Sequence, residues 1–256
     1  MADNTTKTQE LSSGKISALV LRYSLTTFAA LLFSALYNLV DTLFVSRGVG
    51  DTAMGGVAVV FPFMIIQGAV AQTVGGGAAS IVSRLLGKRD NAAAGEVTLN
   101  AMATFYISAV LVSLIGFIFM NPILSLLGAT PDILPYARQY FTIVLAGNVF
   151  STGFSSIIRA EGRMTYALLI WLIPTGVNVV LDAVFIFALD MGVRGAALAT
   201  VLCQFTSFVM SILFFKKYSC QSFTGARLRL STVKQAVGTS PSVPRSQPPV
   251  SISLPP

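Results

Sequence analysis

Two aspartates, Asp41 and Asp182, each lie within a long apolar segment of the sequence that carries no other charge. Placing an acid at the centre of a bilayer costs roughly 2.5–3.5 kcal/mol on insertion scales, so an intramembrane carboxylate indicates an ion or proton site. Such a carboxylate can release and rebind a proton, or it can bind a cation. The pair therefore predicts cation chemistry inside a membrane.

Each acid has a polar neighbour on its own helix face. Tyr37 precedes Asp41 by four residues, and Asn178 precedes Asp182 by four; residues at this spacing lie on the same face of a helix. Pro174 lies one further turn before Asn178 and removes a backbone donor, which predicts a kink there. Freed backbone groups are tolerated in a membrane only against other helices or a watery cavity, so this face is predicted to point inward.

The candidate cation site consists of Asp41, Asn178, Asp182 and Thr200. Their carboxylate, amide and hydroxyl oxygens suit a hard cation such as Na⁺. Two carboxylates close together in low dielectric do not both stay ionised cheaply, so a shared proton is the alternative to Na⁺. A competing interpretation places Asp41, which is close to Arg47 in sequence, at the membrane interface as a solvated acid.

Gln67 is a further candidate, as a cavity-lining residue. It is a polar side chain in an apolar segment that also contains Pro62. An isolated glutamine can instead form a hydrogen bond from one transmembrane helix to another. The sequence leaves these two roles open.

The elements that position these residues are predicted to be transmembrane helices. Of the 256 residues, 54% are hydrophobic and 11% charged, and the mean hydropathy is +0.75, which is unlike a soluble domain. We expect an all-α, polytopic membrane protein with a polar N-terminus over 1–16, a six-helix bundle over 17–215, and a basic, then Pro/Ser-rich, disordered tail over 216–256. The six expected spans, each near the ~20 residues that cross a bilayer, are 17–45, 54–82, 97–120, 135–158, 165–188 and 193–215.

The net charge of +7 reflects membrane topology. Nucleic-acid binding would require a soluble basic face with stacking aromatics, which this pattern lacks. If the N-terminus is cytoplasmic, the basic residues before the tail fall on the cytoplasmic side except for Arg47, Arg138 and Arg194, as the positive-inside rule expects. The sequence therefore predicts a multi-pass protein of the plasma (inner) membrane with both termini in the cytoplasm.

The sequence contains no histidine, which excludes histidine metal ligation and Ser-His-Asp chemistry. It shows no enzyme signature, and we expect no cofactor beyond the coupling ion, Na⁺ or H⁺. The expected partners are small organic substrates and the lipid bilayer.

Several motifs together resemble one known family. The segments YNLVD, VAQTVGGGAAS and GKRDNAAAGE, followed by the pattern P-x-x-x-N-x-x-x-D, are similar to those of the multidrug and toxic compound extrusion (MATE) family. The resemblance implies a secondary antiporter that exports drugs and other organic cations in exchange for Na⁺ or H⁺. It also implies two six-helix bundles around a V-shaped cavity. The cation site of the N-terminal bundle maps onto Asp41, Asn178, Asp182 and Thr200, with Tyr37 beside the first acid.

The chain departs from the family pattern after its sixth expected span. Where a further span would follow, the sequence reads GTSPSVPRSQPPVSISLPP, which suggests a frameshift or a premature stop. The alternative function is therefore a truncated, non-transporting half-bundle that is inert or acts only by pairing with a second bundle, including a second copy of itself. A third hypothesis, a flippase for lipid-linked precursors, predicts mid-span Arg or Lys facing a cavity, which the sequence does not offer.

Overall fold

The computed structural model describes residues 42–151 and 154–221, together with the single positions 21, 24, 25, 28, 32 and 39. Within these residues the regular structure is helical, and five helical segments are long and apolar enough to cross a membrane. The prediction of an all-α, polytopic membrane protein is confirmed. The first expected span, 17–45, lies mostly outside the described residues, whereas residues 42–49 are helical.

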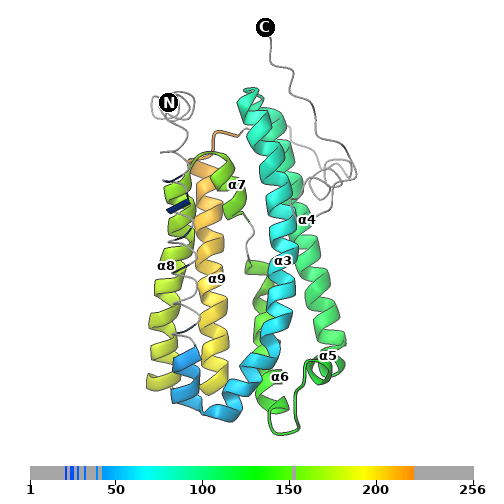
Figure 1. Ribbon diagram of the computed structural model, residues 1–256, viewed down its shortest axis with the longest axis vertical. Coiled ribbons are helices and arrows are strands. Elements are labelled where there is room, and N and C mark those ends of the chain that lie inside the picture. The colour runs from blue at the N-terminus through cyan, green and yellow to red at the C-terminus, as the bar shows by residue number, and fades with distance from the viewer. Residues whose placement is uncertain are drawn as a thin grey trace.

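The long helices lie side by side along the long axis of the molecule, and successive ones run in opposite directions (Figure 1). The α-helices are α3 (Asp51–Gly87), α4 (Asn91–Ile118), α5 (Met120–Leu126), α6 (Leu134–Gly147), α7 (Ser155–Ala160), α8 (Met164–Asp182) and α9 (Gly192–Lys217), with a 3₁₀ turn η1 (Asn148–Phe150) and a π-helical turn η2 (Ala183–Ala188).

Three expected spans differ in detail from the observed helices. The span expected from 97 begins at Asn91, because the Asp90 side chain accepts a hydrogen bond from the Ala93 amide at 3.0 Å and caps the helix. The span expected over 135–158 is divided, since α6 passes into η1 and Ser151 is extended before α7. The span expected over 165–188 changes from α to π geometry after Asp182. The interruption between α6 and α7 contains the polar residues Asn148 and Ser151, which the sequence analysis did not use. The residues of η2 are all apolar, so hydropathy predicted a single helix there.

Buried apolar side chains form two clusters, one toward each end of the bundle. The α7-end core joins α3, α4, α7, α8 and α9 through residues that include Val82, Phe105, Ile157, Ile170 and Phe214. The α5-end core joins the helical residues 42–49 to α3, α5, α6, η2 and α9 through residues that include Val45, Leu124, Phe141, Ile186 and Ala197.

A layer of polar side chains lies between these cores. On α8, for example, Asn178 and Asp182 fall between Ile170 of one core and Ile186 of the other. We call this set the polar layer; its members are Gln67, Asn148, Asn178, Asp182 and Thr200. The two apolar cores hold the helices together above and below it, so polar groups can face one another at mid-height.

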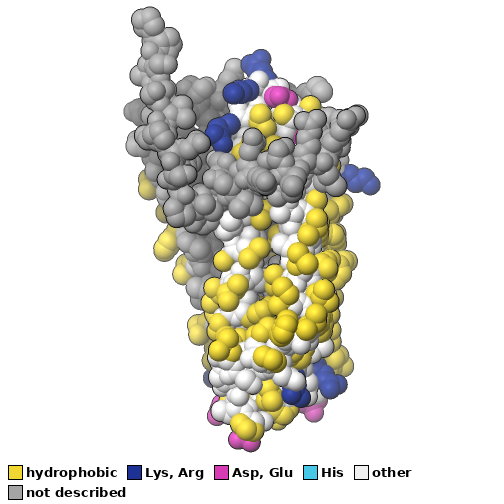
Figure 2. Space-filling view, turned by 90° about the vertical axis from the view of Figure 1, so that its right-hand side faces the viewer, with side chains coloured by type: hydrophobic (Ala, Val, Ile, Leu, Met, Phe, Trp, Pro, Cys, Tyr) yellow, Lys and Arg dark blue, Asp and Glu magenta, His cyan; other side chains and the backbone are white. Residues whose placement is uncertain are grey.

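The outer surface is typical of a protein in a bilayer. Apolar side chains cover the visible sides, and Lys and Arg stand toward the ends (Figure 2). Because the helices alternate in direction, the basic residues of the α3–α4 turn, the α7–α8 turn and the end of α9 gather at one end of the bundle. These residues are Arg84, Lys88, Arg89, Arg159, Arg163, Lys216 and Lys217.

Candidate cation and substrate site

Asn178 and Asp182 are the most deeply buried polar pair predicted from the sequence. Both side chains are 0% exposed and lie one turn apart near the end of α8. Among the described residues, no hydrogen-bond partner reaches either the amide nitrogen or the amide oxygen of Asn178. A buried polar group without a partner costs about 1–3 kcal/mol, so this amide is suited to hold a ligand.

The π-helical turn η2 begins directly after Asp182. Its irregular bonding continues into the following turn, where the Leu189 amide donates to the carbonyl of Val184 at 2.9 Å and the Met191 amide to that of Phe185 at 2.9 Å. The π turn therefore ends the α8 span, since Leu189 and Asp190 are not helical. Sequence analysis missed this feature, because the residues of η2, AVFIFA, carry no signal for it.

Pro174 lies within α8, which remains α-helical on both sides of it. The neighbouring Thr175 hydroxyl donates to the Trp171 carbonyl at 2.7 Å. The change of helical geometry occurs at Ala183, about two and a half turns beyond Pro174, where the sequence predicted a kink. Pro174 is nevertheless buried and faces the bundle interior, as expected from its position one turn before Asn178.

Thr200 lies on α9, opposite the part of α8 that holds the candidate site. Two contacts bracket this region: the Tyr166 hydroxyl donates to the Met210 carbonyl at 2.9 Å, and Gly195 lies against Phe185. Thr200 is 5% exposed, and its hydroxyl donates to the Ala196 carbonyl at 3.0 Å. Because the hydroxyl proton is used in this way, its lone pairs stay available as acceptors.

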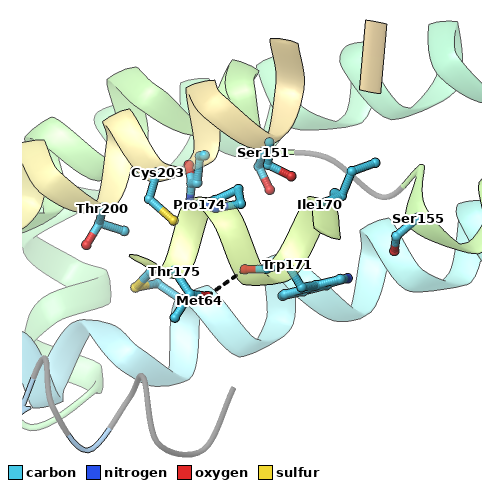
Figure 3. A pocket seen from close by; sticks show the side chains of 11 residues that line it. Met64, Ser151, Ser155, Ile170, Trp171, Pro174, Thr175, Thr200 and Cys203 are labelled. Carbon is cyan, nitrogen blue, oxygen red and sulfur yellow. Dashed lines mark hydrogen bonds between the residues drawn. The ribbon is translucent and has the colours of Figure 1, made fainter. Parts of the chain in front are cut away.

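A cavity of about 220 Å³ opens beside these residues (Figure 3). Pro174 and Thr200 line it from facing helices, and Trp171 and Met64 contribute large apolar surfaces. The cavity therefore touches two residues that the sequence singled out. Residues it did not single out complete the lining, among them Ser151, Ile170, Cys203 and Gln204.

Gln67 does not line this cavity. Its side-chain nitrogen donates to the side-chain oxygen of Asn148 in η1, and Asn148 donates in turn to the Ser113 hydroxyl at 2.9 Å and the Ala109 carbonyl at 3.0 Å. The network joins α3, α4 and η1, and Gln67 and Asn148 also line a second cavity of about 10 Å³. Gln67 thus forms a helix-to-helix bond and lines a small cavity, and sequence analysis missed Asn148 and Ser113.

Asp41 and Tyr37 lie outside the described residues. The residues that follow them, 42–49, pack against η2: the rings of Phe44 and Phe187 meet edge to face at 5.7 Å, and a Cβ on Gly48 would lie 2.2 Å from Ile186. The helical residues 42–49 are therefore in contact with the turn that follows Asp182.

These observations define a multi-pass helical membrane protein with a buried polar layer and an internal cavity. The MatE family model matches residues 26–184, and the chain belongs to the MATE family of transporters. The resemblance noted in the sequence is thereby confirmed.

The known relatives that match extend beyond this chain. It is 25% identical over 203 residues to the multidrug export protein MepA of Staphylococcus aureus (strain MRSA252), which covers 78% of this chain and 45% of MepA. It is 28% identical to an FAD transporter of Shewanella oneidensis, over 78% of this chain and 46% of that protein. A structure of the MATE multidrug transporter DinF-BH superposes with a TM-score of 0.81 at 33% identity, covering 88% of this chain and 52% of that one. The chain thus spans about half the length of these relatives.

Proposed function

We propose that this chain supplies the cation-binding bundle of a secondary antiporter that exports drugs or other organic cations in exchange for Na⁺ or H⁺. The observation that carries the proposal is the pair Asn178 and Asp182, two fully buried polar side chains one turn apart on a membrane-crossing helix. Such groups are expensive in hydrocarbon, and ion binding gives a reason for their presence.

The proposed cation site consists of Asp41, Asn178, Asp182 and Thr200, with Tyr37 beside the first acid. The buried amide, the acceptor lone pairs of Thr200 and the packing of residues 42–49 on η2 support it. Na⁺ would take carboxylate, amide and hydroxyl oxygens as ligands, whereas H⁺ would neutralise one of the acids. In either case the charge changes beside the π turn, where helical hydrogen bonding is already irregular.

The proposed substrate site is the 220 Å³ cavity, because it shares Pro174 and Thr200 with the cation region. Trp171 offers a face for a cation, and Met64 offers an adaptable apolar contact. The residues described as lining the cavity include no Lys or Arg, which favours an organic cation over a phosphate-bearing molecule such as FAD.

Replacing Asp182 with Asn tests the cation site. The matched control is Asp190→Asn, because Asp190 is an exposed acid in the turn before α9 and its φ of 50° is one that Asn also adopts. The purified chain is unfolded thermally in NaCl, in KCl and across a pH series. A bound ion stabilises the folded state by about 2.7 kcal/mol at 100 times its Kd.

For sodium coupling we expect Na⁺ to raise the melting temperature of the wild type and of Asp190→Asn but not that of Asp182→Asn. For proton coupling the same difference appears in the pH series instead. An Asp182→Asn chain that responds to both Na⁺ and pH like the wild type overturns the proposal.

A second candidate function follows from the half-length match to the relatives. Alternating access moves one bundle against another, so this bundle would transport only when paired with a second bundle. The test expresses the chain alone and together with the remaining half of a relative, and measures drug efflux. Efflux by the chain alone favours the first candidate, and efflux only in the pair favours the second.

The proposed orientation places the basic end of the bundle, and with it both termini, in the cytoplasm of a cell whose plasma membrane holds the protein. The positive-inside rule and the gathering of basic residues at one end support this orientation. A membrane-impermeant thiol reagent should then label Cys220, just past α9, from the cytoplasmic side only.

A further inference from the structure

Outside the cation region, one carboxylate binds three consecutive residues of a distant segment. Glu161 lies in the turn between α7 and α8, and its Oε1 accepts hydrogen bonds from the Ser219 hydroxyl at 2.7 Å and from the Gln221 side-chain nitrogen at 2.6 Å. Its Oε2 accepts from the Cys220 amide at 3.2 Å and from the Cys220 thiol at 3.5 Å. We call these four residues the Glu161 cluster.

The cluster has internal support. The Gln221 amide donates to the Ser219 hydroxyl oxygen at 3.1 Å, so this hydroxyl accepts one bond while it donates another to Glu161. Gln221 is only 7% exposed, although it lies beyond the end of α9. The segment after the helix is therefore held against the bundle.

Burial explains why so many donors converge on this acid. Partial removal from water raises the pKa of the Glu161 carboxyl, and the bonds from Ser219, Cys220 and Gln221 oppose that shift. Hydrogen bonds to an ionised group are about twice as strong as neutral ones. Two arginines are nearby. The charge of Arg163 lowers the pKa of the Cys220 thiol, and Arg159 donates a hydrogen bond to the Ser156 hydroxyl at 3.1 Å.

Glu161, and not the end of α9, contacts the side chains of residues 219–221. The end of α9 is closed by amides of Tyr218 and Ser219 that donate to the Phe214 carbonyl at 2.8 and 3.0 Å. Those bonds end the helix, but they do not involve the side chains of Ser219, Cys220 or Gln221. Residues 219–221 are instead bound by Glu161, which belongs to the α7–α8 turn.

We propose that Glu161 is a positioning residue that fastens residues 219–221 to the turn between α7 and α8. The α7–α8 turn and the exit of α9 then move as one unit. The role of this unit in a transport cycle rests on the proposed exporter function, whereas the fastening itself does not.

Cys220 reports on the fastening directly. Burial, together with the charge of Glu161 and the hydrogen bond to it, raises the pKa of its thiol to about 11. Thiolate is the reactive form, so a pKa about two units above the ordinary value slows alkylation by on the order of 100-fold. The full-length chain in detergent, carrying Cys203→Ser so that Cys220 is its single thiol, is reacted with a maleimide.

We expect Glu161→Gln and Glu161→Ala to raise the labelling rate of Cys220 by at least about 10-fold, because release of residues 219–221 reduces the burial of the thiol and the charge of Glu161 is removed as well. Ser219→Ala keeps the carboxylate and removes one donor, so its increase should be smaller. Asp132→Asn, an acid-to-amide change at an exposed position between α5 and α6, is the matched control and should leave the rate unchanged.

A second thiol distinguishes release of residues 219–221 from a loss of packing throughout the bundle. Cys203 lines the cavity within the bundle, and in a Cys220→Ser chain its labelling should not respond to Glu161→Gln. Faster labelling of Cys220 alone supports the proposal. An unchanged rate at Cys220, or faster labelling at both thiols, overturns it. Asp182→Asn should leave Cys220 labelling as it is, so failure of the cation site and failure of the fastening are distinguishable.

Discussion

Phe44 and Phe187 meet edge to face with their ring centroids 5.7 Å apart. Phe44 comes three residues after Asp41, and Phe187 lies in the π turn that begins after Asp182. The ring pair joins the helical residues 42–49 to the end of the α8–η2 span. The packing of residues 42–49 is therefore tied to the geometry of η2.

Gly48 is predicted to be essential for the packing of residues 42–49 on η2. A Cβ at this position would lie 2.2 Å from Cγ2 of Ile186, whose side chain is 2% exposed and has little room to move. We expect Gly48→Ala to destabilise the chain by about 1–3 kcal/mol, the usual cost of overpacking. Thermal unfolding in detergent measures this loss.

Gly68→Ala is the control for Gly48→Ala, because no atom lies within 4 Å of a Cβ built at Gly68 in α3. It should leave the melting temperature unchanged or raise it slightly, since alanine favours a helix. Equal effects of the two substitutions would contradict the close packing of residues 42–49 on η2.

Gln67 and Asn148 should show coupled energies. Their side chains are hydrogen-bonded across the bundle, and Asn148 is 0% exposed. In a double-mutant cycle with Gln67→Leu and Asn148→Leu, we expect a coupling of about 0.6 kcal/mol, with an upper bound near 1.7, as for other interhelical bonds in membranes. Denaturant or thermal unfolding of the four chains gives the value, and strict additivity would refute the bond.

Stability should depend on pH through Glu161. Burial raises the pKa of its carboxyl above the ordinary value of 4.5, so the folded chain binds this proton more tightly than the unfolded chain. The resulting stabilisation is fully present below pH 4.5 and is lost as the pH rises through the higher folded pKa.

Glu161→Gln does not titrate, so it isolates this contribution. The melting temperature of the wild type relative to Glu161→Gln should fall as the pH rises from 4.5 toward neutrality. A difference that instead grows with pH would mean that the donors of Ser219, Cys220 and Gln221 outweigh burial.

Cys203 offers a test of the proposed substrate cavity. It lines the 220 Å³ cavity together with Trp171 and Thr200. In a Cys220→Ser chain, an organic dye cation that fills the cavity should slow maleimide labelling of Cys203, because the thiol is covered. The dye concentration that halves the rate measures its affinity.

Trp171→Ala should weaken the protection of Cys203 by roughly 5- to 30-fold in dye concentration, which corresponds to about 1–2 kcal/mol for a cation over an indole face. Trp171 is 48% exposed, so its removal should cost little stability. Val180→Ala, an exposed apolar change on the same helix and outside the cavity lining, is the control. Protection that survives Trp171→Ala unchanged would argue against the cavity as the dye site.

Local periodicity was enough to predict several relationships from sequence. Asn178 and Asp182 share a buried face because four residues make about one helical turn, and the burial of both side chains agrees with that argument. The transmembrane class followed from hydropathy, because the bilayer imposes a minimum apolar length on every span. Neither inference needed knowledge of how the helices pack.

Contacts between distant segments were decided only by the tertiary structure. Asn148 becomes the partner of Gln67, 81 residues away, because α6, which Asn148 follows directly, packs against α3. The π turn after Asp182 likewise lies against α9, where a Cβ on Gly195 would lie 3.0 Å from Cβ of Phe185. Glu161 meets Ser219 from 58 residues away because α8 and α9 form an antiparallel pair that returns the chain to its starting end. Sequence periodicity describes one helix at a time, whereas these partners depend on how the helices pack against one another.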